Sequence, residues 1–138
     1  MVTVTPRPVV GHRFAALGFT AVLVLHGIAH FAGLVDSFDK ADAGGSVDYL
    51  GGAFTISDPT LLRVAGVLWA VAGTAVVLSA LLVLTHHRLA RPAVLAALVV
   101  SLTLSVVGSP AATVGVVLNL GLLALVTLRP SWVDLDQR

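Results

Sequence analysis

Four apolar stretches constrain this chain more than any other feature of its sequence. They cover residues 14–34, 59–84, 92–107 and 111–128. A helix needs about 20 residues to cross the roughly 30 Å hydrocarbon core of a bilayer, and each stretch meets or approaches that length. The sequence therefore predicts an all-α fold, in which four helices form an integral membrane bundle in up-down order.

The composition agrees with a bilayer protein. Hydrophobic residues make up 57% of the 138 positions and charged residues only 11%, which is far too apolar for an ordinary soluble domain of this size. The four spans use most of the chain and leave residues 35–58 as the one substantial external loop. We therefore expect a single transmembrane domain over residues 1–138, with any functional site inside the bundle.

Residue types that are absent or rare exclude several classes of function. The chain has no cysteine, which excludes disulfides, thiolate metal sites and iron–sulfur clusters. Its net charge is +1 and it has no block of Lys or Arg, so nucleic acid is not an expected partner. The lipid bilayer is the expected environment, and we expect so small a chain to form a homo-oligomer or to join a larger membrane complex.

The basic residues are distributed unevenly about the spans. Lys40 and Arg63 lie on one side among five aspartates, and the other six basic residues lie on the opposite side. Those six are Arg7, Arg13, Arg88, Arg91, Arg129 and Arg138. Because cytoplasmic loops carry an excess of Lys and Arg, we expect a multi-pass protein of the cell membrane with both termini cytoplasmic and the 35–58 loop external.

Two histidines stand four residues apart inside the first apolar stretch. His26 and His30 lie in the segment LVLHGIAHFAGL, with no other ionisable residue between Arg13 and Asp36. Ionisable groups at membrane depth are costly to insert and commonly mark a pathway, a ligand or a partner. Positions i and i+4 share one face of a helix, so both imidazoles are expected to face the same neighbours.

Polar residues on the other spans predict what the histidines meet. Ser101 and Asn119 lie in stripes of small residues at i, i+4 spacing on the third and fourth spans, and such stripes let helices approach closely in lipid. Counting about 1.5 Å per residue from the external ends places His26, Ser101 and Asn119 roughly 10 to 14 Å deep. The same count places His30 and Arg63 together at roughly 6 Å.

The predicted ligand-binding site combines these residues in the external half of the bundle. Its members are His26, His30, Arg63, Ser101 and Asn119. In this interpretation Arg63 holds an anionic or carbonyl-bearing head group, while the histidines, which titrate near neutrality, exchange protons. The leading function is a membrane binding or accessory protein whose pocket takes a partner helix or a lipid-soluble molecule, such as a quinone or an isoprenoid, that enters between helices.

Other interpretations of the histidine pair stay open. A small redox or isomerase-type membrane enzyme would use His26 and His30 for proton transfer. Histidines at i and i+4 can also ligate one metal ion, but a third ligand is missing, so we assign no metal residues. Two histidines on one helical face cannot take opposite axial positions of one haem, so a haem would require a single axial ligand or a partner chain. A purely structural role, in which the side chains bond across helices, is the remaining alternative.

The histidine segment also carries a resemblance. The relevant residues are Leu25, His26, Gly27, Ile28, Ala29, His30, Phe31 and Gly33, then Pro59, Gly66, Leu68 and Trp69, and finally Asn119. The pattern L-H-G-x-x-H-x-x-G and these later residues resemble a group of small uncharacterised bacterial four-helix membrane proteins that are sometimes placed loosely with DoxX-like proteins. The resemblance implies the same fold and topology but no particular reaction, and the external loop is longer here than in that group.

Overall fold

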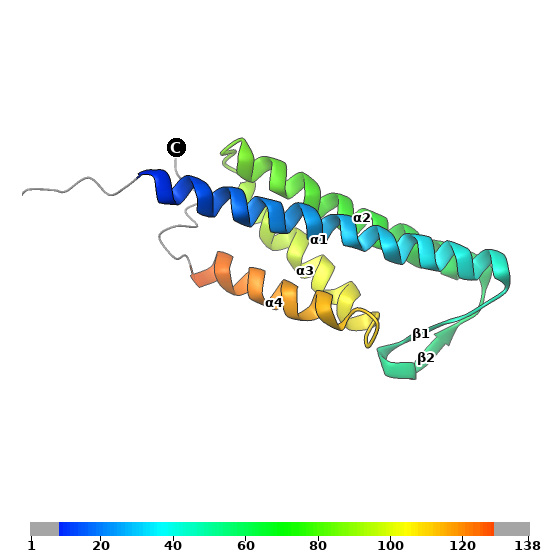
Figure 1. Ribbon diagram of the computed structural model, residues 1–138. Coiled ribbons are helices and arrows are strands. Elements are labelled where there is room, and N and C mark those ends of the chain that lie inside the picture. Colours follow the sequence, from blue (N-terminus) through cyan, green and yellow to red (C-terminus); the bar gives the residue numbers. More distant parts are fainter. Residues whose placement is uncertain (1–8, 129–138) are drawn as a thin grey trace, which may run out of the picture.

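Four helices make up most of the computed structural model, which describes residues 9–128, with side chains from Phe14 onward. The helices are α1 (Val9–Ala43), α2 (Pro59–Leu84), α3 (Ala90–Val107) and α4 (Thr113–Leu128). Successive helices run in opposite directions (Figure 1), which confirms the predicted all-α bundle in up-down order. Three of them, α1 to α3, are long and apolar enough to cross a membrane, whereas α4 is a shorter apolar helix.

The distribution of side chains is that of a protein surrounded by lipid. Large apolar side chains cover the outside; Phe14, Val114 and Leu128, for example, are 71%, 80% and 79% exposed. The described interior instead encloses polar groups, namely Thr20, His26, His30, Ser37, Ser79, Ser101, Ser105 and Asn119. An apolar exterior of this extent would aggregate in water, and it supports the assignment of the chain as a membrane protein.

Helix α1 continues well past the predicted end of the first span. The prediction placed residues 35–43 in an external loop, but they are helical, so this boundary was wrong. The segment is charged, but it has no helix-breaking residue before Gly44, which takes a left-handed φ of 66°. The N–H of Gly45 then donates to the Lys40 carbonyl oxygen at 2.8 Å, which is the capping bond of a Schellman motif.

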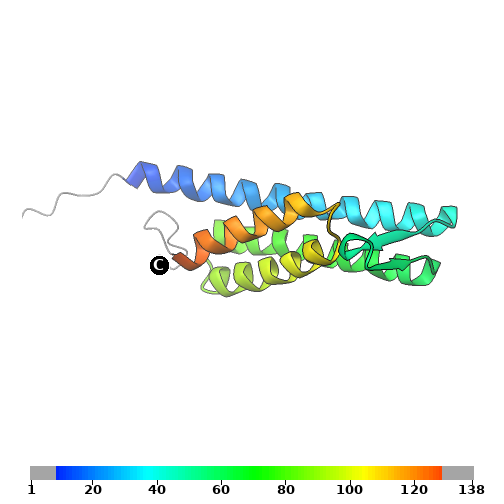
Figure 2. The same ribbon diagram turned by 90° about the horizontal axis from the view of Figure 1, so that it is seen from below.

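A short hairpin replaces the rest of the predicted loop. Strand β1 (Val47–Tyr49) pairs antiparallel with β2 (Phe54–Ile56), and a 3₁₀ turn, Leu50–Gly52, connects them. The N–H of Gly51 donates to the Ser109 carbonyl oxygen at 2.8 Å, which ties the hairpin to the turn between α3 and α4. The hairpin therefore lies against the ends of these two shorter helices, beside the projecting parts of α1 and α2 (Figure 2).

The starts of the later helices differ slightly from the predicted spans. Helix α2 begins at Pro59 as predicted, and the Asp58 carboxylate caps it by accepting from the Leu61 N–H at 2.9 Å. Helix α3 begins at Ala90, two residues before Pro92, because proline is tolerated anywhere in a first turn. Helix α4 begins at Thr113 instead of residue 111.

Part of the charge asymmetry behind the predicted orientation can be placed in the structure. Arg88 lies in the turn between α2 and α3, Arg91 lies in the first turn of α3, and both are at the end of the bundle opposite the hairpin. Arg7, Arg129 and Arg138 lie outside the described residues, and the side chain of Arg13 is not described. The orientation of the chain in the membrane therefore stays a prediction.

The helices pack in chain order, α1 on α2, α2 on α3 and α3 on α4, whereas α1 and α4 meet at no more than isolated points. A close approach joins Gly27 of α1 to Gly73 of α2. A Cβ atom on Gly73 would lie 2.5 Å from the Gly27 carbonyl oxygen and 2.9 Å from His30 Cβ, and one on Gly27 would lie 2.7 Å from Val77 Cγ2. This contact fixes the height of the histidines against α2.

Substitution at this contact tests the packing. We expect Gly27→Ala and Gly73→Ala each to lower the free energy of unfolding by about 1 to 3 kcal/mol, because the added methyl group meets backbone that cannot move aside. Gly18→Ala, in the same helix as Gly27 but with nothing within 4 Å of its added Cβ, is the matched control and should be neutral or slightly stabilising. Thermal unfolding in detergent measures the difference, and equal stability of all three variants would contradict the packing.

Candidate functional site

Four of the five predicted site residues meet in one buried hydrogen-bonded cluster. His26 and His30 come from α1, Ser101 from α3 and Asn119 from α4, and each is at most 5% exposed. The Ser101 hydroxyl lies 3.1 Å from His26 Nε2 and 2.7 Å from His30 Nε2. The two rings approach edge to face, with centroids 4.7 Å apart. The cluster therefore joins α1 to both α3 and α4.

The carbonyl of Gly115 fixes the direction of the bonds at His26. Asn119 Nδ2 donates to the Gly115 carbonyl oxygen at 2.9 Å, and its second contact, at 3.4 Å, is with the Ser105 hydroxyl. Asn119 Oδ1 is thus the atom that lies 3.1 Å from His26 Nε2. Because an amide oxygen only accepts, His26 Nε2 carries a proton and donates, shared between Asn119 and Ser101.

A second carbonyl fixes the direction at His30. His30 Nδ1 lies 3.0 Å from the backbone carbonyl oxygen of His26, so Nδ1 carries the proton and donates. In the neutral ring Nε2 is then an acceptor, and the Ser101 hydroxyl donates to it. The hydrogen bonds within the cluster therefore require one proton on each imidazole, on Nε2 in His26 and on Nδ1 in His30.

Arg63 does not join this cluster, and its predicted place beside His30 is wrong. Its guanidinium Nη2 donates to Asp42 Oδ1 at 2.7 Å, and both side chains are largely exposed. The depth count was wrong because it took the first helix to end near residue 34. Arg63 instead meets Asp42, which lies twelve residues, or about 18 Å, beyond His30 along α1. Its partner, Asp42, lies in the part of α1 that the sequence analysis had placed in a loop.

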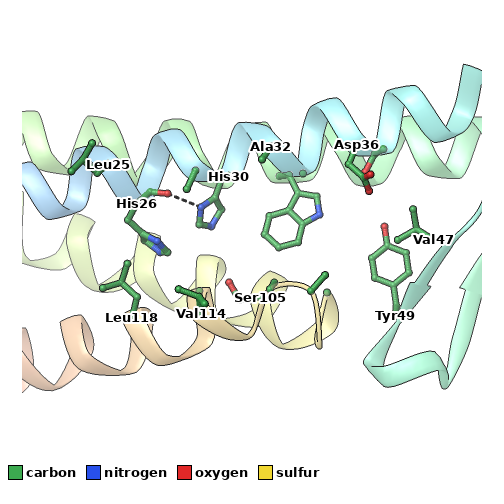
Figure 3. Close-up of a pocket in the computed structure, with 18 of the residues that line it drawn as sticks. Leu25, His26, His30, Ala32, Asp36, Val47, Tyr49, Ser105, Val114 and Leu118 are labelled. Carbon is green, nitrogen blue, oxygen red and sulfur yellow. Dashed lines mark hydrogen bonds between the residues drawn. The ribbon is translucent and has the colours of Figure 1, made fainter.

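A cavity of about 620 Å³ lies beside the histidines, between α1 and α4 (Figure 3). Several residues that border it also face outward from the bundle; Leu25 and Val114 are 67% and 80% exposed. Because α1 and α4 do not pack together along their length, the cavity opens sideways between them. A molecule dissolved in the bilayer would therefore reach it without crossing the aqueous phase.

The walls of the cavity are mostly apolar, with polar groups at two levels. His26, His30 and Ser105 form the inner level, and Asp36, Ser37 and Asp48 form the outer one. The described lining contains no Lys or Arg. The cavity is therefore unsuited to an anionic head group, contrary to the role predicted for Arg63.

Two aromatic residues that the sequence analysis did not place in the site complete the walls. Trp69 of α2 lies 5.4 Å from the His30 ring, and added Cβ atoms on Gly33 and Gly108 would collide with its indole at 2.6 and 2.8 Å. Tyr49 of the hairpin closes the outer end, and burial raises the pKa of its phenol above the ordinary value. The glycines beside Trp69 were visible in the sequence, but their common neighbour was not.

The donor set does not favour a metal ion or a haem held by both histidines. Among the described residues, no group of three or more His, Cys, Asp or Glu side chains is placed to hold a metal. His30 uses both ring nitrogens on protein groups, and His26 uses Nε2 in the same way. Ligation by both rings would therefore break bonds that hold three helices together.

Comparison with known proteins does not assign the chain to a family. No family model, no curated protein and no solved structure matches the chain. The resemblance to DoxX-like proteins therefore stays a prediction, and the function must be argued from the site itself.

Loss of the bridging hydroxyl should weaken the bundle. We expect Ser101→Ala to lower the free energy of unfolding by about 1 to 3 kcal/mol, because it leaves His30 Nε2 buried without a donor. Thr103→Ala, which removes an exposed hydroxyl bonded within α3 to the Val99 carbonyl, is the matched control. If the two variants melt at the same temperature, Ser101 does not hold the histidines as described.

Proposed function

We propose that this protein is an integral membrane binding or accessory protein, which takes a lipid-soluble small molecule into the cavity between α1 and α4. The observation that carries the proposal is a cavity of about 620 Å³ that has two hydrogen-bonded histidines in its wall and opens between lipid-facing residues. Volumes of 300 to 1,000 Å³ with apolar walls and few polar groups are typical of small-molecule sites.

The size of the cavity favours a small molecule over a partner helix. A helix is about 10 Å across and rises 1.5 Å per residue, so 620 Å³ holds only roughly five residues of it. The hairpin also closes the outer end, where Tyr49 is only 5% exposed. A partner helix would have to displace this hairpin, whereas a flexible chain fits beneath it.

The charges around the cavity indicate that the ligand is neutral. Asp36 and Asp48 are the ionisable groups of the outer level, and Arg63 is engaged with Asp42 elsewhere. A buried anion without a cationic partner costs several kcal/mol, so a phosphate or carboxylate head group is disfavoured. An uncharged quinone or isoprenoid remains consistent with these walls.

The proposed orientation places the hairpin and the cavity's outer level outside the cell. The turn that holds Arg88 would then be cytoplasmic together with both termini, as the positive-inside rule requires. In this arrangement the protein is a multi-pass cell-membrane protein. Self-association or assembly into a larger membrane complex belongs to the same proposal, because α4 leaves a broad apolar face exposed.

The second candidate function is a small redox or isomerase-type enzyme. It is favoured by the continuous chain from His26 through Ser101 to His30, since hydroxyl-bridged imidazoles can pass a proton. The two functions differ in what happens to the ligand. An isomerase would exchange ligand hydrogen with solvent deuterium, whereas a binding protein would return the ligand unlabelled.

Filling the cavity should remove the ligand without unfolding the protein. We expect native mass spectrometry of the wild type to show a copurified lipid-soluble molecule, which Ala29→Phe loses because the ring occupies the space that Ala29 borders. Ala21→Phe is the matched control, because Ala21 is an exposed alanine of the same helix outside the cavity. Equal ligand content in both variants, or none in the wild type, would contradict the proposal.

Arg63 provides a further check on the revised site. We expect Arg63→Ala to retain the copurified ligand fully and to change stability by at most about 1 kcal/mol, because exposed ion pairs contribute little. The same mass spectra measure this. Loss of the ligand would restore the original prediction that the guanidinium holds a head group.

A further inference from the structure

The cluster leaves one hydrogen-bonding position unused, and that position belongs to His26. Its Nε2–H donates to Ser101 and Asn119, so in the neutral ring Nδ1 is a hydrogen-bond acceptor without a partner. No described residue donates to it. Every other ring nitrogen of the pair is bonded to the protein.

This free nitrogen is accessible. Among the described residues, the enclosed side-chain polar atoms that lack a partner are Tyr49 Oη and Arg91 Nε, and His26 Nδ1 is not one of them. The accessible space that His26 borders is the cavity. A molecule in the cavity therefore meets an acceptor at its inner end, where Val22, Leu25 and Leu118 also border the cavity.

We infer that the site selects a neutral lipid alcohol or phenol, whose hydroxyl donates to His26 Nδ1 while its apolar chain fills the cavity. This inference rests on the proposed binding function. A buried acceptor left without a donor is costly, so a ligand that supplies a hydroxyl is preferred to one that does not. Carbonyl-only lipids such as oxidised quinones have no donor, so their reduced, hydroxyl-bearing forms bind more tightly.

The charge pattern excludes donors that carry or acquire a charge. An ammonium group would have to be buried beside apolar side chains, about ten helical residues or roughly 15 Å from Asp36. An acid would lose its donor on ionisation and would then face two aspartates without a cation. A hydroxyl brings a proton to Nδ1 without bringing a charge.

The test compares farnesol with its methyl ether, which keeps the apolar chain but removes the donor. We expect farnesol to bind the purified wild-type protein roughly three- to tenfold more tightly, which is the range expected for one net hydrogen bond. His26→Gln should abolish this preference, because the glutamine amide can still donate to Ser101 and Asn119 but offers no acceptor at the Nδ1 position. Ala29→Phe should weaken both probes together.

A spectroscopic measurement on the wild type tests the same hydrogen bond without requiring that a variant folds. Farnesol should shift the ¹⁵N resonance of His26 Nδ1 towards the values of a hydrogen-bonded acceptor, and the methyl ether should not. Equal affinity for both probes, with both weakened by Ala29→Phe, would overturn the inference and leave the binding function standing. If neither probe binds in a way that Ala29→Phe weakens, both proposals fail.

Discussion

The hydroxyl of Ser101, held between two imidazoles, is the interaction on which the rest of the structure depends. Helix α1 packs along α2 but hardly touches α4, so its polar contacts across the bundle pass through this cluster. In lipid the hydrophobic effect does not favour helix association, so close packing and hydrogen bonds must stabilise it. The histidines therefore hold the far helices in place at their level, and an apolar core from all four helices, including Phe19, Leu98 and Leu122, packs on the side away from the hairpin.

The cavity follows from this arrangement together with the unequal lengths of the helices. At about 1.5 Å per residue, the 35 residues of α1 extend roughly 50 Å, whereas the 16 residues of α4 cover only about 24 Å. The hairpin fills the space above α3 and α4, and the Gly51 bond to Ser109 keeps it there. The result is a site closed at its outer end, polar in its inner wall and open to lipid on one side.

The sequence was sufficient to predict the four helices and the meeting of His26 with Ser101 and Asn119, because both follow from periodicity. Apolar length marked the helices, and i, i+4 spacing with depth counting brought Ser101 and Asn119 to the level of His26. The same count failed for Arg63, because it started from a first helix that ended near residue 34, whereas α1 continues to Ala43 and Arg63 meets Asp42 there. The helical end of α1 was missed because hydropathy identifies only the apolar part of a helix. The role of Trp69 was missed because the glycines that contact it come from different helices.

The tautomeric states of the two histidines test this account most directly. Solid-state ¹⁵N NMR of the protein in bilayers, with His12, His86 and His87 replaced so that only the pair reports, distinguishes the protonated nitrogens. The bond directions set by the Gly115 and His26 carbonyls require His26 to carry its proton on Nε2 and His30 on Nδ1. Two rings in the same tautomer, or two that charge freely as the pH falls, would contradict the cluster and the acceptor it presents to the cavity.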